Sequence, residues 1–265
     1  MSDIRNAGAK GTPGRQAVQA EGRLLRANHP AGSQEQRPLD PAILRSLSDA
    51  ALAPQQDDRR HAVAAALANG ISAEEIADLY IPAIAREMGD KWCVDQMSFA
   101  SVTIGVSRLQ GMLRDLGPQW AGDHLLDPTA PSVLLIVPEN VHHTLGAIIL
   151  SGQLRRRGIS IKLMLGEPVT AIAAQLRRCR YAAVFISASQ SESLESLRRI
   201  IDVVRSVAQA PLPVVVGGGI LQKDTADTIT ELTGADHATG QTDEGLRLCG
   251  IKPPKHSSAA AVNGI

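Results

Sequence analysis

The sequence predicts an α/β protein in which a helical bundle precedes a parallel, doubly wound sheet. Residues 41–116 carry apolar side chains at helical spacing, interrupted by short turn segments. From residue 133 onward, short runs rich in Val, Ile and Leu alternate with helical segments, which is the pattern of β-α-β units. A chain of 265 residues is long enough to bury an apolar core in each part.

The composition limits the classes of partner. The 27 basic and 27 acidic residues give a formal net charge of zero, which argues against a nucleic-acid groove spread over the surface. Aromatic residues make up only 2%, so bases or sugars would find few stacking platforms. Cys93, Cys179 and Cys249 show no C-x-x-C spacing, as expected of a reduced protein. No apolar run approaches the ~18 residues of a membrane span, so we expect a cytoplasmic protein without membrane contact.

The N-terminal part divides into a leader and a bundle. Residues 1–38 are rich in Gly, Ala, Gln, Arg and Pro without an apolar period, and we expect a flexible leader. Residues 39–118 are expected to form the bundle, as four helices with short connections. The first of these helices opens with Ile43, and the second begins at Asp57 and stops at Asn69-Gly70.

The third bundle helix has the clearest start signal. Ser72 and Glu75 are spaced as a capping box, in which the Ser72 hydroxyl accepts from a backbone N–H and the Glu75 side chain reaches back. Pro82 should kink this helix about one turn along, because proline has no N–H to donate. The fourth helix should span residues 97–116 and end at Gly117-Pro118.

The C-terminal part has the alternation of a Rossmann-like domain. Residues 119–132 are expected to be a linker, residues 133–251 the sheet domain and residues 252–265 a flexible tail. Strands are predicted at 133–137, 159–165, 181–187 and 213–218, with a short fifth unit near 235–239. Helices are predicted to follow, ending at Arg157 in the first case and covering 168–178, 191–208, 222–233 and 242–248 in the others.

Three segments that directly follow strands have unusual composition. They are NVHHTLG at 140–146, SASQS at 187–191 and GGGI at 217–220. In an open parallel sheet the ligand binds beyond the carboxyl ends of the strands, so all three should face one crevice. Glycines without a Cβ let a ligand approach the backbone closely. The G-x-G-x-x-G spacing of a dinucleotide site, a Walker sequence and the acidic cluster of a receiver domain are all missing from these segments.

The spacing of these segments resembles that of cobalamin-binding domains. That family carries D-x-H-x-x-G, then S-x-L about forty residues later, then G-G after about twenty-seven more. Here the stretch His143-Thr144-Leu145-Gly146 supplies H-x-x-G, and Ser187-Ala188-Ser189 and Gly217-Gly218 follow at the matching intervals. The resemblance spans residues 133–250 and implies cobalamin as the cofactor.

The resemblance also implies residue roles. His143 would be the lower axial ligand of cobalt, which suits a neutral imidazole. Ser187, Ala188 and Ser189 would contact the inserted nucleotide tail, and Gly217, Gly218 and Gly219 would clear its path. His142 is a neighbour and a candidate for a secondary contact. A loop histidine can equally face solvent or cap a helix.

Two positions depart from the family pattern. Val141 stands where the family has the Asp that hydrogen-bonds the ligand histidine, and Ser189 stands where the family has leucine. Without that Asp, the cobalt–histidine bond is expected to be weaker or more sensitive to pH. The second departure is expected to loosen the packing of the tail without abolishing binding.

The bundle carries a second resemblance. The segment from Met88 to Trp92 is similar to the cap of light-sensing cobalamin proteins such as CarH and of corrinoid carrier proteins. It implies that Trp92 covers the upper corrin face. Val102-Thr103 stands where CarH-like proteins have Glu-His. The alternative is that Trp92 is an ordinary core aromatic of the bundle.

The pattern W-C-x-D-x-x-S-F-A-S-V-T-I-G-x-x-R-L-Q, which begins at Trp92, together with H-T-L-G resembles the AerR/PpaA group. This resemblance implies a photoreceptor-like regulator, not an enzyme, that binds adenosyl-, methyl- or hydroxocobalamin. It also implies that the protein antagonises a PpsR/CrtJ-type repressor of photosynthesis genes and contacts DNA only indirectly, through that repressor. The alternative is a corrinoid methyl carrier of a methyltransferase system, which commonly has the same bundle-plus-sheet layout.

Overall fold

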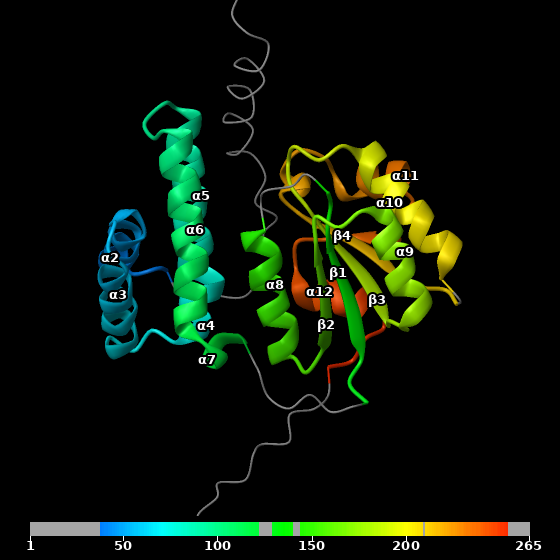
Figure 1. The fold of residues 1–265 in the computed structure, drawn as a ribbon, viewed down its shortest axis with the longest axis horizontal. Coiled ribbons are helices and arrows are strands. Elements are labelled where there is room, and N and C mark those ends of the chain that lie inside the picture. Colours follow the sequence, from blue (N-terminus) through cyan, green and yellow to red (C-terminus); the bar gives the residue numbers. More distant parts are fainter. Residues whose placement is uncertain (1–37, 122–128, 140–143, 209, 254–265) are drawn as a thin grey trace, which may run out of the picture.

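The computed structural model describes residues 38–121, 129–139, 144–208 and 210–253. These residues form a helical part and a sheet part that lie side by side (Figure 1). The predicted fold class, a helical N-terminal region followed by a doubly wound parallel sheet, is confirmed. None of the described helices combines the length and apolar character that crossing a membrane requires.

The helical part follows the predicted order of elements. Its bounds are α2 Pro41–Leu52, α3 Gln56–Ala68, α4 Ala73–Glu75, η1 Ile76–Tyr80, α5 Ile81–Cys93 and α6 Phe99–Leu116. The capping box is present, with the Ser72 hydroxyl accepting from the Glu75 N–H at 3.1 Å and the Glu75 carboxylate accepting from the Ser72 N–H at 2.9 Å. The apolar core between these helices includes Leu47, Ile84 and Leu109.

The region before Pro82 is disrupted in a form that the sequence did not predict. Residues 76–80 are a π-helix instead of an α-helix with a kink, and the Ile81 N–H donates to the carbonyl of Ile76, five residues back. Pro82, which has no N–H to donate, is the second residue of α5 and comes directly after this π turn. The wider π turn thus lets the chain continue through the proline.

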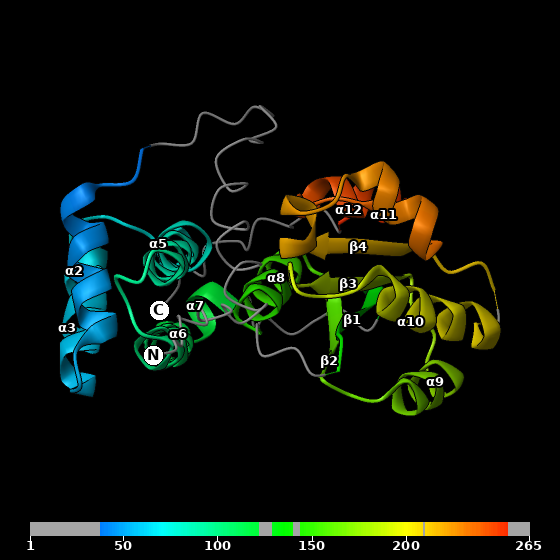
Figure 2. The same ribbon diagram turned by 90° about the horizontal axis from the view of Figure 1, so that it is seen from above.

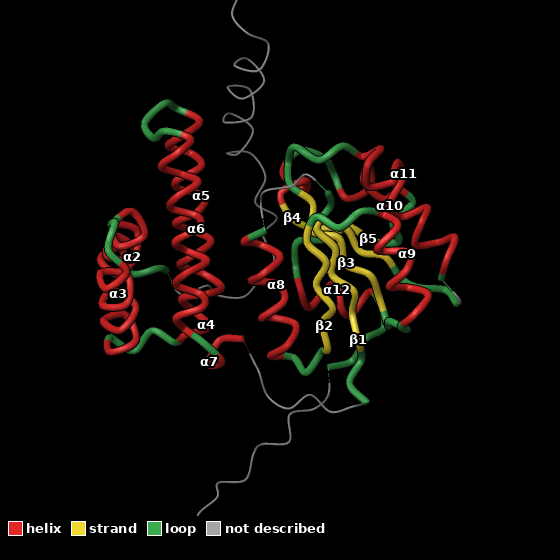
Figure 3. The backbone as a smooth tube through the Cα atoms, viewed as in Figure 1, coloured by secondary structure: helices red, strands yellow, loops and turns green. Residues whose placement is uncertain are grey.

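The sheet part has five parallel strands in the order β2-β1-β3-β4-β5 (Figure 3). The strands are β1 Ser132–Val137, β2 Ser160–Leu165, β3 Ala183–Ala188, β4 Val214–Gly218 and β5 His237–Ala238. The helices between and after them are α8 Leu145–Arg156, α9 Val169–Arg178, α10 Leu194–Val207, η2 Gly219–Gln222, α11 Ala226–Thr233 and α12 Thr242–Leu248. Each predicted strand and helix is found with bounds shifted by at most a few residues.

Both faces of the sheet are covered, as the unbroken apolar runs of the strands require. One apolar core joins the sheet to α9, α10 and α11, through residues such as Ile172, Ile200 and Ile229. The other core joins the opposite face to α8 and α12, through Leu154 and Leu246. In Figure 2, α8 lies on one side of the strands and α9 and α10 lie on the other.

Helix α8 belongs to both parts of the fold. Ala147 and Leu154 are fully buried against the sheet, whereas Leu145 and Ile149 belong to the apolar core of the helical bundle. In both ribbon views α8 lies between the bundle and the strands (Figures 1 and 2). The bundle and the sheet therefore share a helix.

A short helix, α7 (Pro118–Ala121), closes the same joint and lies within the segment that the sequence suggested as a linker. Its Trp120 is 6% exposed, and the indole N–H donates to the Leu113 carbonyl. The ring lies against Gly152 of α8, where a Cβ would overlap it. The start of the expected linker is thus a buried contact between α6 and α8.

An ion pair joins the far end of α8 to the π-helix. Arg156 donates to the Asp78 carboxylate and to the Trp120 carbonyl, and the two charged side chains are only 16% and 23% exposed. Burial raises the pKa of Asp78, and the nearby Arg156 guanidinium offsets only part of that effect. Oδ1 of Asp78 is buried without a hydrogen-bond partner among the described residues.

We expect the two partners of this ion pair to respond unequally to mutation. Arg156→Met should lower the free energy of unfolding by about 3 kcal/mol near pH 7, because it leaves a buried carboxylate unpaired. Asp78→Asn should lower it by only about 1 kcal/mol, because the amide oxygen can still accept from the Arg156 guanidinium, which also keeps its hydrogen bond to the Trp120 carbonyl. Urea denaturation of both variants and the wild type measures the difference, and equal losses would contradict it.

The Arg156–Asp78 ion pair also determines whether the free energy of unfolding rises or falls with pH. An acid whose pKa is raised on folding binds its proton more tightly in the folded state, so stability falls as pH rises through the folded pKa. Arg156→Met should raise the pKa of Asp78 further. The stability deficit of this variant relative to wild type should therefore shrink between pH 7 and pH 5, in the same urea experiment.

Candidate functional site

The carboxyl ends of the strands form the edge where a ligand is expected. In the order β2-β1-β3-β4-β5 the chain leaves β1 toward one edge of the sheet and β3 toward the other, so the topological switch point lies between β1 and β3. Ligands of open α/β sheets bind in the crevice beside such a point. The second and third segments singled out in the sequence begin within the last residues of β3 and β4 and so lie at this edge, and the described end of the first segment opens α8.

The second and third of these segments lie next to each other. Ser187 pairs with Gly217, and Ala188 pairs with Gly218, across the β3–β4 ladder. These residues are the last ones of β3 and β4, so Ser187, Gly217 and Gly218 lie within strands as predicted, and Ala188 extends β3 by one residue. Ser187 is half-buried, and the half-buried Ser189 contributes a hydroxyl 2.9 Å from that of Ser191. The sheet thus brings small, uncharged groups together at its edge.

The glycines of β4 are required by the protein's own backbone. A Cβ on Gly217 would lie 2.6 Å from the Thr239 carbonyl oxygen. Gly218 has a φ of 99° in the left-handed region, and a Cβ there would lie 2.5 Å from the Ala188 carbonyl oxygen. Gly219 has less severe contacts, the nearest being the Gln190 backbone nitrogen at 3.2 Å. Close packing of the strand ends therefore explains the first two glycines, whether or not they also clear a path for a ligand.

The first segment is described only from Thr144 onward. Thr144 is the N-cap residue of α8, and its hydroxyl accepts a hydrogen bond from the Gln110 side chain on α6 at 3.0 Å. Leu145 is buried, whereas Gly146 is exposed and a Cβ on it would meet no atom within 4 Å. Val141, His142 and His143 lie outside the described residues, so the role suggested for His143 stays a prediction.

Trp92 lies in the last turn of α5 and is 36% exposed, so it is not a fully buried core residue of the described bundle. Its ring contacts Phe99, with centroids 5.8 Å apart and planes tilted by 55°. Phe99 opens α6 and is 67% exposed. Val102 is half-buried and Thr103 exposed on the same helix. Phe99 was not singled out from the sequence, although an aromatic side chain beside an N-cap serine was a usable signal.

The geometry of α6 shows on which side of the bundle the Trp92–Phe99 pair lies. Phe99 and Gln110 are eleven residues apart, or about three turns and ~16 Å, so they share one face of α6. Because Gln110 bonds to Thr144, that face points toward the sheet part. Figure 1 shows the α5–α6 connection at the same end of the molecule as the carboxyl ends of the strands. The aromatic pair therefore stands on the side from which a ligand at this edge would be covered.

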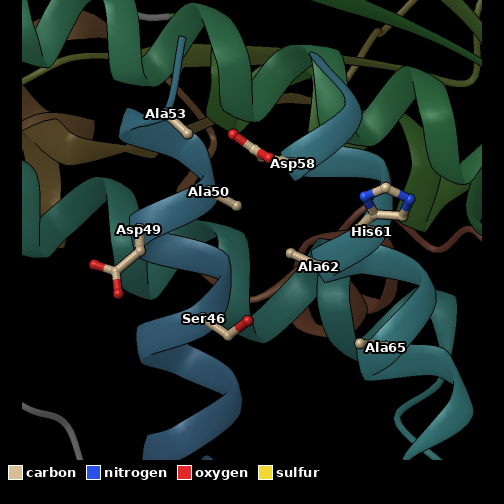
Figure 4. Close-up of a pocket in the computed structure, with 8 residues that line it drawn as sticks. All are labelled: Ser46, Asp49, Ala50, Ala53, Asp58, His61, Ala62 and Ala65. Carbon is tan, nitrogen blue, oxygen red and sulfur yellow. The ribbon is translucent and has the colours of Figure 1, made fainter. Parts of the chain in front are cut away.

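A different hollow in the helical part is a poor candidate. It lies between α2 and α3, on the side of the bundle away from the sheet (Figures 1 and 2). Figure 4 shows the residues that line it: Ser46, Asp49, Ala50, Ala53, Asp58, His61, Ala62 and Ala65. Across the described part of the chain, no three His, Cys, Asp or Glu side chains gather as a metal site would need.

Comparison with known proteins identifies the sheet part. Residues 131–248 match the family model of the B12 binding domain. An uncharacterized 20.5 kDa protein of the bchF–crtJ intergenic region of Rhodobacter capsulatus is 33% identical over 169 residues, which cover 64% of this chain and 87% of that protein. The chain belongs to the B12-binding family of this protein. The resemblance noted in the sequence and the predicted cobalamin cofactor are thereby confirmed.

Two further relatives extend the comparison. The HTH-type transcriptional repressor CarA of Myxococcus xanthus is 33% identical over 150 residues, 55% of this chain, and the chain spans about half (47%) of CarA. The structure of the Methanosarcina barkeri monomethylamine corrinoid protein superposes with a TM-score of 0.63 at 16% identity, over 78% of this chain and 96% of that one. At this identity the likeness shows the fold alone.

The residues at the sheet edge fit the B12-binding assignment. The edge offers serine hydroxyls beside two glycines that are packed against the Thr239 and Ala188 carbonyls, so the groups that a ligand would meet there are small and polar. Trp92 and Phe99 supply an apolar surface opposite that edge. Small polar groups on one side and aromatic groups on the other suit a cofactor with a polar tail and a flat macrocycle.

We expect the β4 glycines to matter for folding without any cofactor. Gly218→Ala should lower the free energy of unfolding of the ligand-free protein by at least ~2 kcal/mol, because it combines a left-handed φ with a backbone clash. Gly146→Ala is the matched control, since this helical glycine has open space around it and alanine favours the helix by up to about 1 kcal/mol. Urea denaturation measures both. A Gly218→Ala protein of wild-type stability that only lost cobalamin would show this explanation to be wrong.

Proposed function

We propose that the protein is a cobalamin-dependent, light-responsive transcriptional regulator that acts as an antirepressor on a PpsR/CrtJ-type repressor of photosynthesis genes. The observation that supports it best is the family: a B12-binding domain whose R. capsulatus relative is encoded beside crtJ. The similarity to CarA, itself named as a transcriptional repressor, also favours a role in the regulation of transcription. The protein would act in the cytoplasm and turn over no substrate.

The roles of individual residues follow from the placement of the site. His143, at the end of the β1 segment, would ligate cobalt from below through a neutral imidazole. Ser187 and the Gly217–Gly219 segment would hold the nucleotide tail against the ends of β3 and β4. Trp92, with Phe99 against it, would cover the opposite face. When bound in its adenosyl or methyl form, cobalamin would supply a cobalt–carbon bond that light can break.

The structure suggests how a change at the cofactor reaches a partner. The bundle and the sheet already share α8, so the switch need not bring two separate parts together. The region that would respond is instead the end of the bundle formed by the C-terminal turn of α5 and the start of α6, because its aromatic pair and Val94 are exposed. A differential binding energy of a few kcal/mol between the two states moves such an equilibrium decisively.

A corrinoid methyl carrier is the second candidate. The similar fold of the monomethylamine corrinoid protein favours it, since that protein also spans a helical part and a sheet part within the region that superposes. A carrier needs a methyltransferase partner and a cobalt that cycles between methylated and reduced forms. A regulator needs neither, so the two candidates differ in a directly measurable way.

The first test is an absorbance experiment. Purified protein would be mixed with adenosyl-, methyl- and hydroxocobalamin, in darkness and after illumination, and then desalted. We expect at least one form to be retained with a base-off spectrum that changes with light, and His143→Ala to lose that spectrum because the axial imidazole is gone. His142→Ala is the matched control and should keep it. Loss of all three forms on desalting would remove the proposed function.

The second test concerns the partner. A PpsR/CrtJ-type repressor bound to a fluorescent operator fragment would be titrated with the cobalamin-loaded protein, in dark and light. We expect the repressor to leave the DNA in one light state only, while the protein alone gives no shift of the DNA. Methyl transfer to an acceptor, without any effect on the repressor, would favour the carrier instead.

A further inference from the structure

The start of α8 is held by the helical bundle. The Gln110 side-chain amide on α6 donates to the Thr144 hydroxyl at 3.0 Å, a contact between residues 34 apart in the chain. The next residue, Leu145, is 8% exposed and is part of the apolar core of the bundle. Thr144 and Leu145 are the two residues between His143 and Gly146 in the H-x-x-G motif. Both middle residues of the motif are therefore in contact with the bundle.

The Thr144 hydroxyl does not make the capping hydrogen bond that is usual at the start of a helix. A threonine at the N-cap accepts from the N–H two or three residues on. The hydroxyls of Ser72, Ser98, Ser193 and Thr225 do this in the same chain. Thr144 makes no such bond, and its φ of −90° and ψ of −13° are helical instead of extended. Its hydroxyl accepts from Gln110 instead.

The other end of α8 is fixed independently. Arg156, in the last turn, is held by Asp78 and by the Trp120 carbonyl, about 18 Å along the helix from its start. The end of α8 is thus held by contacts of its own, separate from those at Thr144. The contacts of Gln110 and of the bundle core around Leu145 define where the helix begins.

We infer that Gln110 is a positioning residue for the proposed cobalt ligand: its hydrogen bond to Thr144 holds the residue that adjoins His143. This inference rests on the proposed function. It gives the bundle a second role besides covering the cofactor, because α6 touches the ligand segment at Gln110 and carries Phe99 three turns away. One helix thereby connects the two sides of the cofactor site.

The test uses variants that remove the hydrogen bond but keep the shape. Gln110→Met retains the side-chain length, and Thr144→Val replaces the hydroxyl by a methyl group. Thr144→Ser keeps the hydroxyl, and Ser107→Ala changes an exposed residue one turn away on the same helix. The full-length proteins would be titrated with hydroxocobalamin at fixed pH, recording both the dissociation constant and the fraction of bound cofactor with a histidine-ligated spectrum.

We expect Gln110→Met and Thr144→Val each to weaken binding about two- to tenfold, as the loss of one hydrogen bond would, and to lower the histidine-ligated fraction. The double variant should be no worse than either single one. Thr144→Ser and Ser107→Ala should match the wild type. Circular dichroism of the ligand-free proteins checks folding, and if Gln110→Met fails to fold, the smaller change Thr144→Val decides alone.

The outcomes separate this inference from the proposed function. A wild-type protein that retains no cobalamin removes the proposed function and the inference with it. A wild type that binds, with Gln110→Met and Thr144→Val unchanged or with strictly additive losses, overturns the inference only. A Thr144→Ser protein as weak as Thr144→Val would also overturn it, because the hydroxyl would then not be what matters.

Discussion

Helix α8 has to bury two apolar faces at once, and the rest of the structure depends on how it does so. Ala147 and Leu154 lie against the sheet, whereas Leu145 and Ile149, about half a turn round the helix, complete the core of the bundle. Close approach on the bundle side requires Gly152, because the Trp120 ring occupies the space of a side chain. This double burial fixes the bundle beside the carboxyl edge of the sheet and so creates a site with two walls.

The ends of β3 and β4 carry small polar groups, whereas the α5–α6 end of the bundle carries aromatic side chains. On the sheet side, parallel pairing puts Ser187 next to Gly217, and crowding by the Ala188 and Thr239 carbonyls admits only glycine at the end of β4. On the bundle side, the described residues leave Trp92 and Phe99 at the α5–α6 end 36% and 67% exposed. A flat, partly apolar cofactor with a polar tail would match both surfaces.

Local patterns in the sequence predicted most of the elements, because strand and helix periodicities and signals such as the Ser72–Glu75 capping box depend on near neighbours. The alternation of strands and helices also predicted that the segments containing Ser187 and Gly217 would face one crevice. The packing of the helical part against α8 was not predicted, since the contacts of Trp120 with Gly152 and of Asp78 with Arg156 link positions far apart in the chain. The run from Leu145 to Leu154 did hold a signal, because its apolar residues cover more than one helix face. The π-helix before Pro82 was missed because proline specifies a disruption without specifying its form.

The shared helix has a consequence for how the chain acquires its structure. The bundle elements from α2 to α6 precede β1 in the chain, yet two residues of their core, Leu145 and Ile149, follow it. During synthesis from the N-terminus, part of the apolar surface of the bundle therefore stays exposed until β1 and α8 have been synthesised. The sequence boundary between the helices and the sheet is thus not a boundary between independent folding units, and the bundle cut off before β1 would expose the surface that α8 normally covers.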